Sequence, residues 1–345
     1  MRLSSGRTEL ASAFGVCCFG VVTLLPPFVQ YLRRQDHLEE TLSPICSVEL
    51  PTGDEVLLHR RRFEGTGGRH VAIVAGIRGD TPEGVRVLHT VTSILRKVEV
   101  LAGRLDLYPC ANPLAAHRAS RRWPLFDVDL NRLFPGKAGG HPPNQVAHAL
   151  VENVREAEVV IELRGANPAF REMPQAHTRI GRQRERELAE FANVEFVWER
   201  NPGPAAPATF AAQFENVVAL EGGAGNRLMP GVGEELAVGV LNMLARLEVI
   251  SQDDVPRHWA GIHRARHVTD DQVHRVRAER GGFFLPAKPI GEAVSLGEVV
   301  GYVVEPTSAE TREEIRAPAE GYLLAIREQP LIVPGSMVAR LVASS

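Results

Sequence analysis

Apolar and polar residues first alternate on both sides of Pro51-Thr52-Gly53, in the segment ICSVELPTGDEVLLHRRRFEG. Alternation with a period of two around such a turn predicts a β-hairpin. The apolar run HVAIVAGI comes next and predicts a buried strand, and residues 85–98 then carry apolar positions at helical spacing. The chain therefore passes from a hairpin into a strand–helix pattern.

The strand–helix pattern continues to about residue 250. Strands are predicted in RLDLYPCANP, EVVIELRG and NVVALEGG, and helices in PNQVAHALVENVREA, RERELAEFAN and GEELAVGVLNMLARLEVI. Strands that alternate with helices are typical of a parallel sheet covered on both faces. We therefore expect an α/β domain with a mostly parallel or mixed sheet and helices on both faces.

The pattern changes again near the C-terminus. From Gly281 onward, short apolar strands are separated by Gly and Pro roughly every eight residues, which predicts a small all-β domain. We expect an N-terminal helical or apolar extension over residues 1–44, the α/β domain over 45–255, and a linker with the β domain over 256–345.

The N-terminal extension contains the apolar run AFGVCCFGVVTLLPPFV, residues 13–29. This run is shorter than the roughly 20 residues of a spanning helix. It is broken by Pro26-Pro27, and no small-x-small cleavage site follows it. We expect a packing helix of a cytoplasmic protein or an extension upstream of the true start. A membrane anchor is the alternative.

Composition narrows the classes of function. The net charge is only -3, so no broad nucleic-acid or anionic-membrane surface is expected. Basic residues are almost all Arg, as in a GC-rich bacterial genome, and the few lysines leave little room for lysine chemistry. Cys17, Cys18, Cys46 and Cys110 form no CxxC or Cys/His cluster, which indicates reduced structural thiols.

Polar residues follow the predicted parallel strands, where ligand sites of open sheets form. They are Arg78, Asp80, Asn112, Glu162, Arg164 and Glu221. We expect these side chains to lie together at one edge of the sheet, with the loop RRWPLFDVDLNRLFPG beside them.

At this point the sequence resembles the succinylglutamate desuccinylase/aspartoacylase family, a branch of the zinc carboxypeptidase fold. The resemblance rests mainly on residues 112–136, with Asn-Pro-x-Ala, Arg121-x-x-Pro and Asp-Leu-Asn-Arg-x-Phe-Pro-Gly in that order. In addition, VALEGG is similar to the strand that ends in the family's catalytic Glu, here Glu221. The likeness covers about residue 45 to the C-terminus, where the β domain resembles the family's barrel-sandwich domain.

The resemblance also implies a zinc site, and here the sequence departs from it. The family motif Gly-x-His-Gly-x-Glu-x-x-Gly reads GIRGDTPEG, so Arg78 and Thr81 stand at the two ligand positions. The second ligand motif, Asp-Leu-His, reads Glu-Leu-Arg and ends in Arg164. All three former ligand positions therefore hold other residue types.

Arginine cannot replace a zinc-binding His. Its guanidinium has no lone pair to offer and keeps its proton at accessible pH, and two such groups repel a divalent cation. We therefore expect no metal and no cofactor. Without zinc, no bound water has its pKa lowered to about 7, so ordinary amide hydrolysis is not expected. We expect Glu83 to be an ordinary helix-capping carboxylate. We expect Glu162 to pair with an Arg.

Two states of the site remain open. In the first, Arg78 and Arg164 form an open anion site, together with Arg121, Asn131 and Arg132, positions that the resemblance links to substrate binding. In the second, the two arginines pair with Glu221, Glu162 or Asp80 and close a dead site. Asn131 and Arg132 are likewise open to a purely structural interpretation, as an anchored turn.

The leading prediction is a pseudoenzyme that binds a carboxylate-bearing small molecule or a peptide end, with Glu221 as a vestigial general base. The alternative is a deacylase of N-acyl amino acids that works through Glu221 and arginines with no metal or a relocated one. A third function is regulation of a protein partner, and a homo-oligomer is also open.

Overall fold

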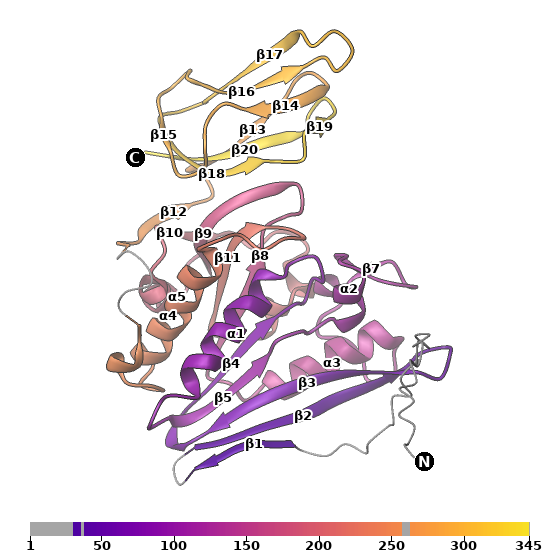
Figure 1. Ribbon diagram of the computed structural model, residues 1–345, viewed down its shortest axis with the longest axis vertical. Coiled ribbons are helices and arrows are strands. Elements are labelled where there is room, and N and C mark those ends of the chain that lie inside the picture. Colours follow the sequence, from indigo (N-terminus) through magenta and orange to yellow (C-terminus); the bar gives the residue numbers. More distant parts are fainter. Residues whose placement is uncertain (1–29, 36–37, 257–262, 345) are drawn as a thin grey trace, which may run out of the picture.

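The computed structural model describes residues 30–35, 38–256 and 263–344 (Figure 1). The expectations for residues 13–29 and for Cys17 and Cys18 lie outside this range. Cys46 and Cys110 are free thiols. No helix in the described ranges is long and apolar enough to cross a membrane.

In the residues that the structure describes, the main body holds twelve strands and five α-helices. The strands are β1 (Gln30–Gln35), β2 (Leu38–Glu49), β3 (Glu55–Glu64), β4 (Thr66–Ala75), β5 (Ala102–Tyr108), β6 (Arg122–Trp123), β7 (Val128–Asp129), β8 (Val159–Gly165), β9 (Phe170–Arg179), β10 (Phe196–Arg200), β11 (Val217–Ala224) and β12 (Arg266–Thr269). The helices are α1 (Glu83–Leu95), α2 (Pro113–His117), α3 (Pro142–Val154), α4 (Gln183–Ala189) and α5 (Val232–Arg246).

The main sheet is mixed, with a parallel centre. Strands β5, β4, β8 and β11 lie side by side and run parallel. Antiparallel pairs flank them: β2 with β3, β3 with β5, and β9 with β11. The predicted mixed sheet is therefore confirmed. The carboxyl ends of the four parallel strands meet at one edge, as the sequence led us to expect.

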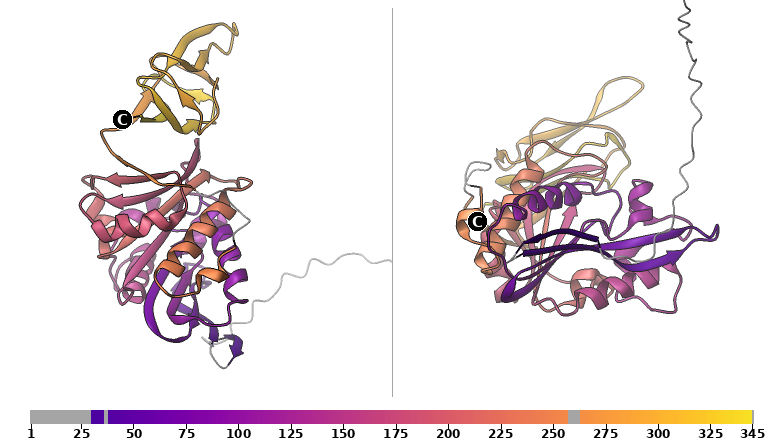
Figure 2. Two further views of the ribbon diagram at one scale, coloured as in Figure 1. Left: turned by 90° about the vertical axis from the view of Figure 1, so that its left-hand side faces the viewer. Right: turned by 60° about the horizontal axis from the view of Figure 1, so that its bottom comes forward.

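Helices cover both faces of this sheet (Figure 2). Alternating side chains of the central strands separate into two cores because successive strand residues point to opposite faces. One core packs α1 and α5 against residues such as Ile73 and Ile161. The other packs α3 against Val74 and Val160. Burial on both faces explains why these strands read as continuous apolar runs.

The C-terminal β domain is also confirmed, and it lies at one end of the molecule (Figure 1). Its strands are β13 (Val273–Arg277), β14 (Gly282–Pro286), β15 (Ala293–Val294), β16 (Val299–Val304), β17 (Thr311–Arg316), β18 (Gly321–Arg327), β19 (Leu331–Ile332) and β20 (Met337–Ala343). These strands enclose their own core around Phe284. Strand β18 pairs with β9, so the main sheet continues into this domain.

Two features differ from the sequence-based expectation. Strand β2 begins at Leu38 and pairs with β3, so regular structure starts before the expected boundary at residue 45. Strands β9 and β10 were not predicted. In β9, Pro174 interrupts the segment FREMPQAHTR and conceals its strand character.

Candidate functional site

Three of the parallel strands deliver charged side chains to the same edge of the sheet. Arg78 follows β4, Arg164 lies near the end of β8, and Glu221 pairs with it in register on β11. Because side chains alternate along β8, Arg164 lies on the same face as Val160, the face covered by α3. The structure therefore places Arg78, Arg164 and Glu221 at one edge of the sheet, as the sequence predicted.

The loop after β4 is held tightly. A Cβ atom on Gly79 would lie 2.0 Å from a backbone carbon of Ala115 in α2, so only glycine allows this approach. The Thr81 hydroxyl donates a hydrogen bond of 2.8 Å to the carbonyl oxygen of Arg78. The Asn112 side chain donates to the Ile77 carbonyl oxygen at 3.2 Å and accepts from the Ala115 amide. These contacts fix where Arg78 leaves the backbone.

Two small cavities flank the Arg164 side chain. The first is lined by Ile77, Arg78, Thr81, Asn131, Glu162, Leu163, Arg164 and Gly165. Its volume is about 10 Å³, room for roughly one water molecule. The second, of about 90 Å³, is lined by Arg164, His177, Thr178, Arg179, Arg200, Ala211, Val217 and Ala219. A whole ligand does not fit the first cavity unless side chains at its rim move.

Arg164 has a partner. Its guanidinium donates to Glu162 at 2.5 Å, and Glu162 is almost completely buried. The pKa of Arg164 is raised overall, because attraction to the Glu162 carboxylate outweighs the opposing effect of burial. For this arginine the closed, ion-paired state applies, and the pairing expected for Glu162 is observed.

Arg78 differs from Arg164. Across the described part of the chain, its guanidinium makes no ion pair or hydrogen bond, although Glu221 and Asp129 attract it at longer range. Burial and repulsion from Arg121 lower the pKa of Arg78. Arg78 is therefore a partly buried cation without a close counter-ion.

The polar residues of the loop before α3 form ion pairs or hydrogen bonds with nearby protein groups. Arg121 pairs with Asp129 at 2.7 Å. The buried Asn131 side chain accepts a hydrogen bond of 2.8 Å from the Phe210 amide, which favours the anchored-turn interpretation of its oxygen. Arg132 is exposed, donates to the Asn131 carbonyl oxygen at 3.3 Å, and does not line the cavity beside Arg78.

Two carboxyl groups next to the site are buried. Asp80 leaves its Oδ1 atom without a hydrogen-bond partner, and burial raises its pKa. Glu83 begins α1 as expected, but its role differs from an ordinary exposed cap. It is fully buried, accepts a hydrogen bond from the Met229 amide, and has a pKa raised by burial. Glu83 braces the loop after β11, where a Cβ on Gly223 would lie 2.8 Å from the Glu83 Cγ atom.

Sequence reasoning did not place His177 beside Glu221. The Nδ1 atom of His177, on β9, lies 3.7 Å from Glu221 Oε2. His177 is buried, neither ring nitrogen has a hydrogen-bond partner, and the ring packs edge-on against Trp198. Burial, Arg200 and Arg164 lower its pKa well below the usual range, so the imidazole is neutral. No motif marks His177, because β9 itself was not recognised.

Strand β9 also carries the buried carboxyl group of Glu172. Glu172 accepts hydrogen bonds from Arg340 of the C-terminal domain at 2.9 Å and from Gln175 at 3.2 Å. Burial and repulsion from Glu221 raise its pKa to about 7. Glu172 therefore changes its charge near neutral pH, at the junction of the two domains.

The residues at the family's ligand positions do not fit a zinc ion. Arg78 and Arg164 present only donor nitrogens, and the Thr81 hydroxyl already donates to a carbonyl oxygen. Within the described residues, no group of three or more His, Cys, Asp or Glu side chains is arranged to hold a metal ion. No metal-dependent step can be derived from this arrangement.

Comparisons with known proteins agree with the motif. The family model of the succinylglutamate desuccinylase/aspartoacylase catalytic domain matches residues 67–247. The N-alpha-acetyl-L-2,4-diaminobutyric acid deacetylase of Halomonas elongata is 25% identical over 313 residues, which are 86% of this chain and 84% of that protein.

Solved structures share the fold. A succinylglutamate desuccinylase/aspartoacylase from Rhodobacter sphaeroides superposes with a TM-score of 0.76 at 21% identity, covering 90% of this chain and 96% of its own. The ectoine utilization protein EutE (DoeB) from Ruegeria pomeroyi gives 0.75 at 18% identity, covering 92% and 99%. The chain belongs to the succinylglutamate desuccinylase/aspartoacylase family.

Proposed function

We propose that this chain is a non-hydrolytic member of its family that binds a carboxylate-bearing small molecule or a peptide end beside Arg78. One observation carries the proposal: among the described residues, Arg78 is a partly buried cation with no close counter-ion. An uncompensated charge of this kind costs stability, and a bound carboxylate would recover that cost. The planar guanidinium also matches a carboxylate with two parallel hydrogen bonds.

The same residues argue against zinc-dependent hydrolysis. Arg78 and Arg164 supply fixed positive charge where the resemblance places ligands, and neither can activate a water molecule. Glu221 could still accept a proton, but general base catalysis alone contributes only about 10²–10⁴-fold. The proposed role of Arg78 is therefore to hold an anion, and Glu221 is a remnant of the catalytic apparatus. Because the cavity beside Arg78 is only about 10 Å³, side chains at its rim must move when the ligand binds.

A metal-independent deacylase is the second candidate. It is favoured by the position of neutral His177, 3.7 Å from Glu221, which could orient or relay a proton for that carboxylate. The Halomonas relative is named as a deacetylase of an N-acetyl amino acid. In this form Glu221 would act as general base and the arginines would bind the substrate anion. Regulation of a protein partner is the third form, and it requires no ligand in the cavity.

The first experiment compares the metal content of the wild type with that of a variant carrying Arg78→His, Thr81→Glu and Arg164→His. We expect the wild type to hold less than about 0.1 equivalent of zinc and the variant to approach about one equivalent, because only the variant presents lone pairs at all three positions. Stoichiometric zinc in the wild type would contradict the proposal and direct attention to a rearranged catalytic site.

Carboxylate binding is tested by calorimetry with N-acetyl amino acids, on the wild type, Arg78→Met and the matched control Arg132→Met. We expect Arg78→Met to weaken binding by about tenfold or more, since it removes a charge-assisted pair. Arg132 is exposed and lies outside the cavity, so its variant should bind as the wild type does. Release of acetate by the wild type, lost in Glu221→Gln, would establish the deacylase instead.

A further inference from the structure

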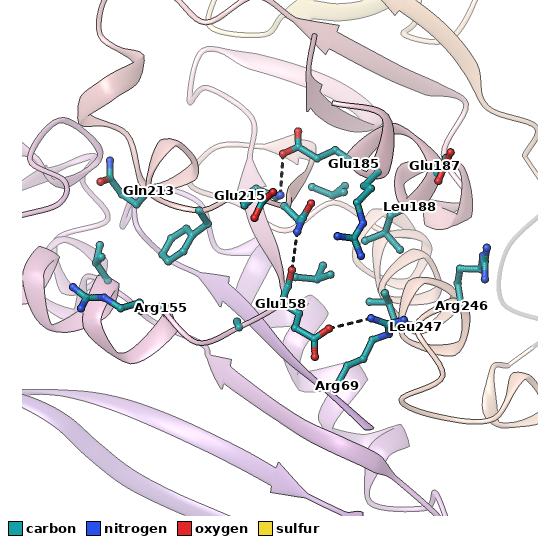
Figure 3. A pocket seen from close by; sticks show the side chains of 18 of the residues that line it. Arg69, Arg155, Glu158, Glu185, Glu187, Leu188, Gln213, Glu215, Arg246 and Leu247 are labelled. Carbon is teal, nitrogen blue, oxygen red and sulfur yellow. Dashed lines mark hydrogen bonds and ion pairs between the residues drawn. The ribbon is translucent and has the colours of Figure 1, made fainter. Parts of the chain in front are cut away.

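A third and larger cavity lies at the opposite end of the parallel strands. It has a volume of about 700 Å³ and opens among the starts of β8 and β11, the end of α5, and α4 (Figure 3). Cavities of 300–1,000 Å³ are typical of small-molecule sites. None of the residues assigned to the proposed function lines it. Any ligand here would therefore bind independently of Arg78 and Glu221.

The floor of this cavity is apolar. Val151, Val159, Leu188 and Phe214 lie there, each in a hydrophobic core and each still 8–9% exposed. Leu247, after α5, adds a partly buried side chain to the same lining. Covering these surfaces would remove apolar area from water, so the floor favours a ligand with an apolar body.

Some charged groups of the rim already have partners. Arg69 pairs with Glu158 at 3.0 Å, and these two side chains face each other in Figure 3. Arg155 pairs with Glu152 on α3. The buried Glu185 carboxylate accepts hydrogen bonds from Arg179 and from the Val217 amide. These groups are satisfied and have little to offer a ligand.

Four other rim residues have no charged partner among the described residues. Arg184 has no ion pair, and Arg246 lies over the Phe191 ring at 5.2 Å without a carboxylate. Glu187 accepts only a hydrogen bond from the Gln183 amide group, and the Glu215 carboxylate is exposed. The rim therefore offers two cations and two anions around an apolar floor.

We propose that this cavity binds a zwitterionic ligand with an apolar body, namely a short apolar peptide with both termini free. Its carboxylate would meet Arg184 or Arg246, its ammonium group would meet Glu187 or Glu215, and its side chains would lie over Leu188 and Phe214. The charge pattern of the rim supports this class, because a purely anionic or cationic ligand would leave one pair of rim charges without a partner.

The test measures binding of the dipeptide Leu-Phe by calorimetry, beside N-acetyl-Leu-Phe and Leu-Phe amide, each of which lacks one terminal charge. We expect the zwitterion to bind about fivefold to tenfold more tightly than either capped form, as exposed ion pairs are individually weak. The double variant Arg184→Glu/Arg246→Glu should bind Leu-Phe about tenfold more weakly than the wild type does. It should bind Leu-Phe amide at least as tightly as the wild type does. The matched control is Arg118→Glu with Arg182→Glu, two exposed arginines outside the cavity, which should leave binding of all three peptides unchanged. Arg78→Met distinguishes binding in this cavity from binding at the carboxyl-end site.

Three results would overturn the proposal. They are no saturable binding of Leu-Phe to the wild type, equal binding of the zwitterion and N-acetyl-Leu-Phe, and loss of binding in Arg78→Met but not in the double variant. The first two exclude this ligand class, and the third assigns the peptide to the carboxyl-end site. Since Arg184 and Arg246 are exposed, their replacement should not prevent folding, and a thermal melt of the variant verifies this.

Discussion

Two clusters of buried charge in this chain differ in whether their charged groups have close partners. Around Asp106, on β5, both carboxylate oxygens have partners: Arg62 donates at 2.7 and 2.9 Å, and His70 lies at 2.9 Å. Burial raises the pKa of Asp106, but the hydrogen bonds from His70 and Arg62 outweigh burial and lower it to about 2. This cluster is closed and contributes stability.

The cluster at the carboxyl ends of the strands is incomplete. Arg78 has no close counter-ion among the described residues, and both ring nitrogens of His177 are buried without hydrogen bonds. Unsatisfied buried polar groups cost free energy, so this arrangement is not explained by stability. The difference indicates that a charge cluster which closes on itself serves the fold, whereas one left open marks a site. Mutations should separate the two clusters.

The largest effect is expected for Asp106→Asn. It leaves the Arg62 guanidinium facing a neutral amide, and breaking a buried pair in this way costs about 3–5 kcal/mol of unfolding free energy. Urea unfolding measures the loss. The matched control is Glu64→Gln, because Glu64 is exposed and lies 4.0 Å from Arg62, and it should cost less than about 1 kcal/mol. Equal losses in the two variants would remove the distinction between the clusters.

A smaller loss is expected for Arg164→Met. Glu162 is 2% exposed and has its ion pair with Arg164, so removing the guanidinium leaves a buried carboxylate unpaired. We expect a loss of about 2–3 kcal/mol. The double variant Arg164→Met/Glu162→Leu should recover most of it, since both partners are then apolar. An unrecovered loss would mean that Arg164 acts through contacts other than Glu162.

Glu172 and Asp106 should make stability depend on pH in opposite directions. Raising the pH should weaken the contribution of Glu172 and strengthen that of Asp106. Its folded-state pKa, about 7, lies above the ordinary 4.5, so its stabilising contribution is full below pH 4.5 and is lost as pH rises through 7. Asp106 instead contributes above pH 3.8, and that contribution is lost as pH falls toward 2. We expect Glu172→Gln to remove on the order of 2 kcal/mol of pH dependence between pH 4.5 and 7. Melting temperatures across this range measure it, and an unchanged profile would assign the dependence to other groups.

The smallest expected change is an increase in stability. Arg78→Met removes a partly buried cation that has no close partner, so we expect a gain of about 1 kcal/mol in unfolding free energy together with weaker carboxylate binding. Urea unfolding and calorimetry on the same preparation test both. A loss of stability would show that Arg78 already has a stabilising partner in solution and that the carboxyl-end site is closed.

Much of the fold followed from local pattern. The apolar strand of residues 70–77, the helix after it and the later strand–helix units were recognisable because burial on two faces gives continuous apolar runs and helices repeat every 3.6 residues. Strand β9 was not recognised, since Pro174 breaks its pattern and its pairing with β11 is long-range. His177 and Glu172 were missed as neighbours of the site for the same reason.

The sequence by itself determined the family, through residues 112–136, and the residue types at the three former ligand positions. It could not decide whether Arg78 and Arg164 behave alike. The structure separates them: Arg164 meets Glu162, and Arg78 has no close counter-ion among the described residues. The cavity of about 700 Å³ at the amino ends of β8 and β11 likewise had no sequence signal. Charge pairing and cavity shape depend on which distant side chains the sheet register brings within a few ångströms, and no local pattern encodes that.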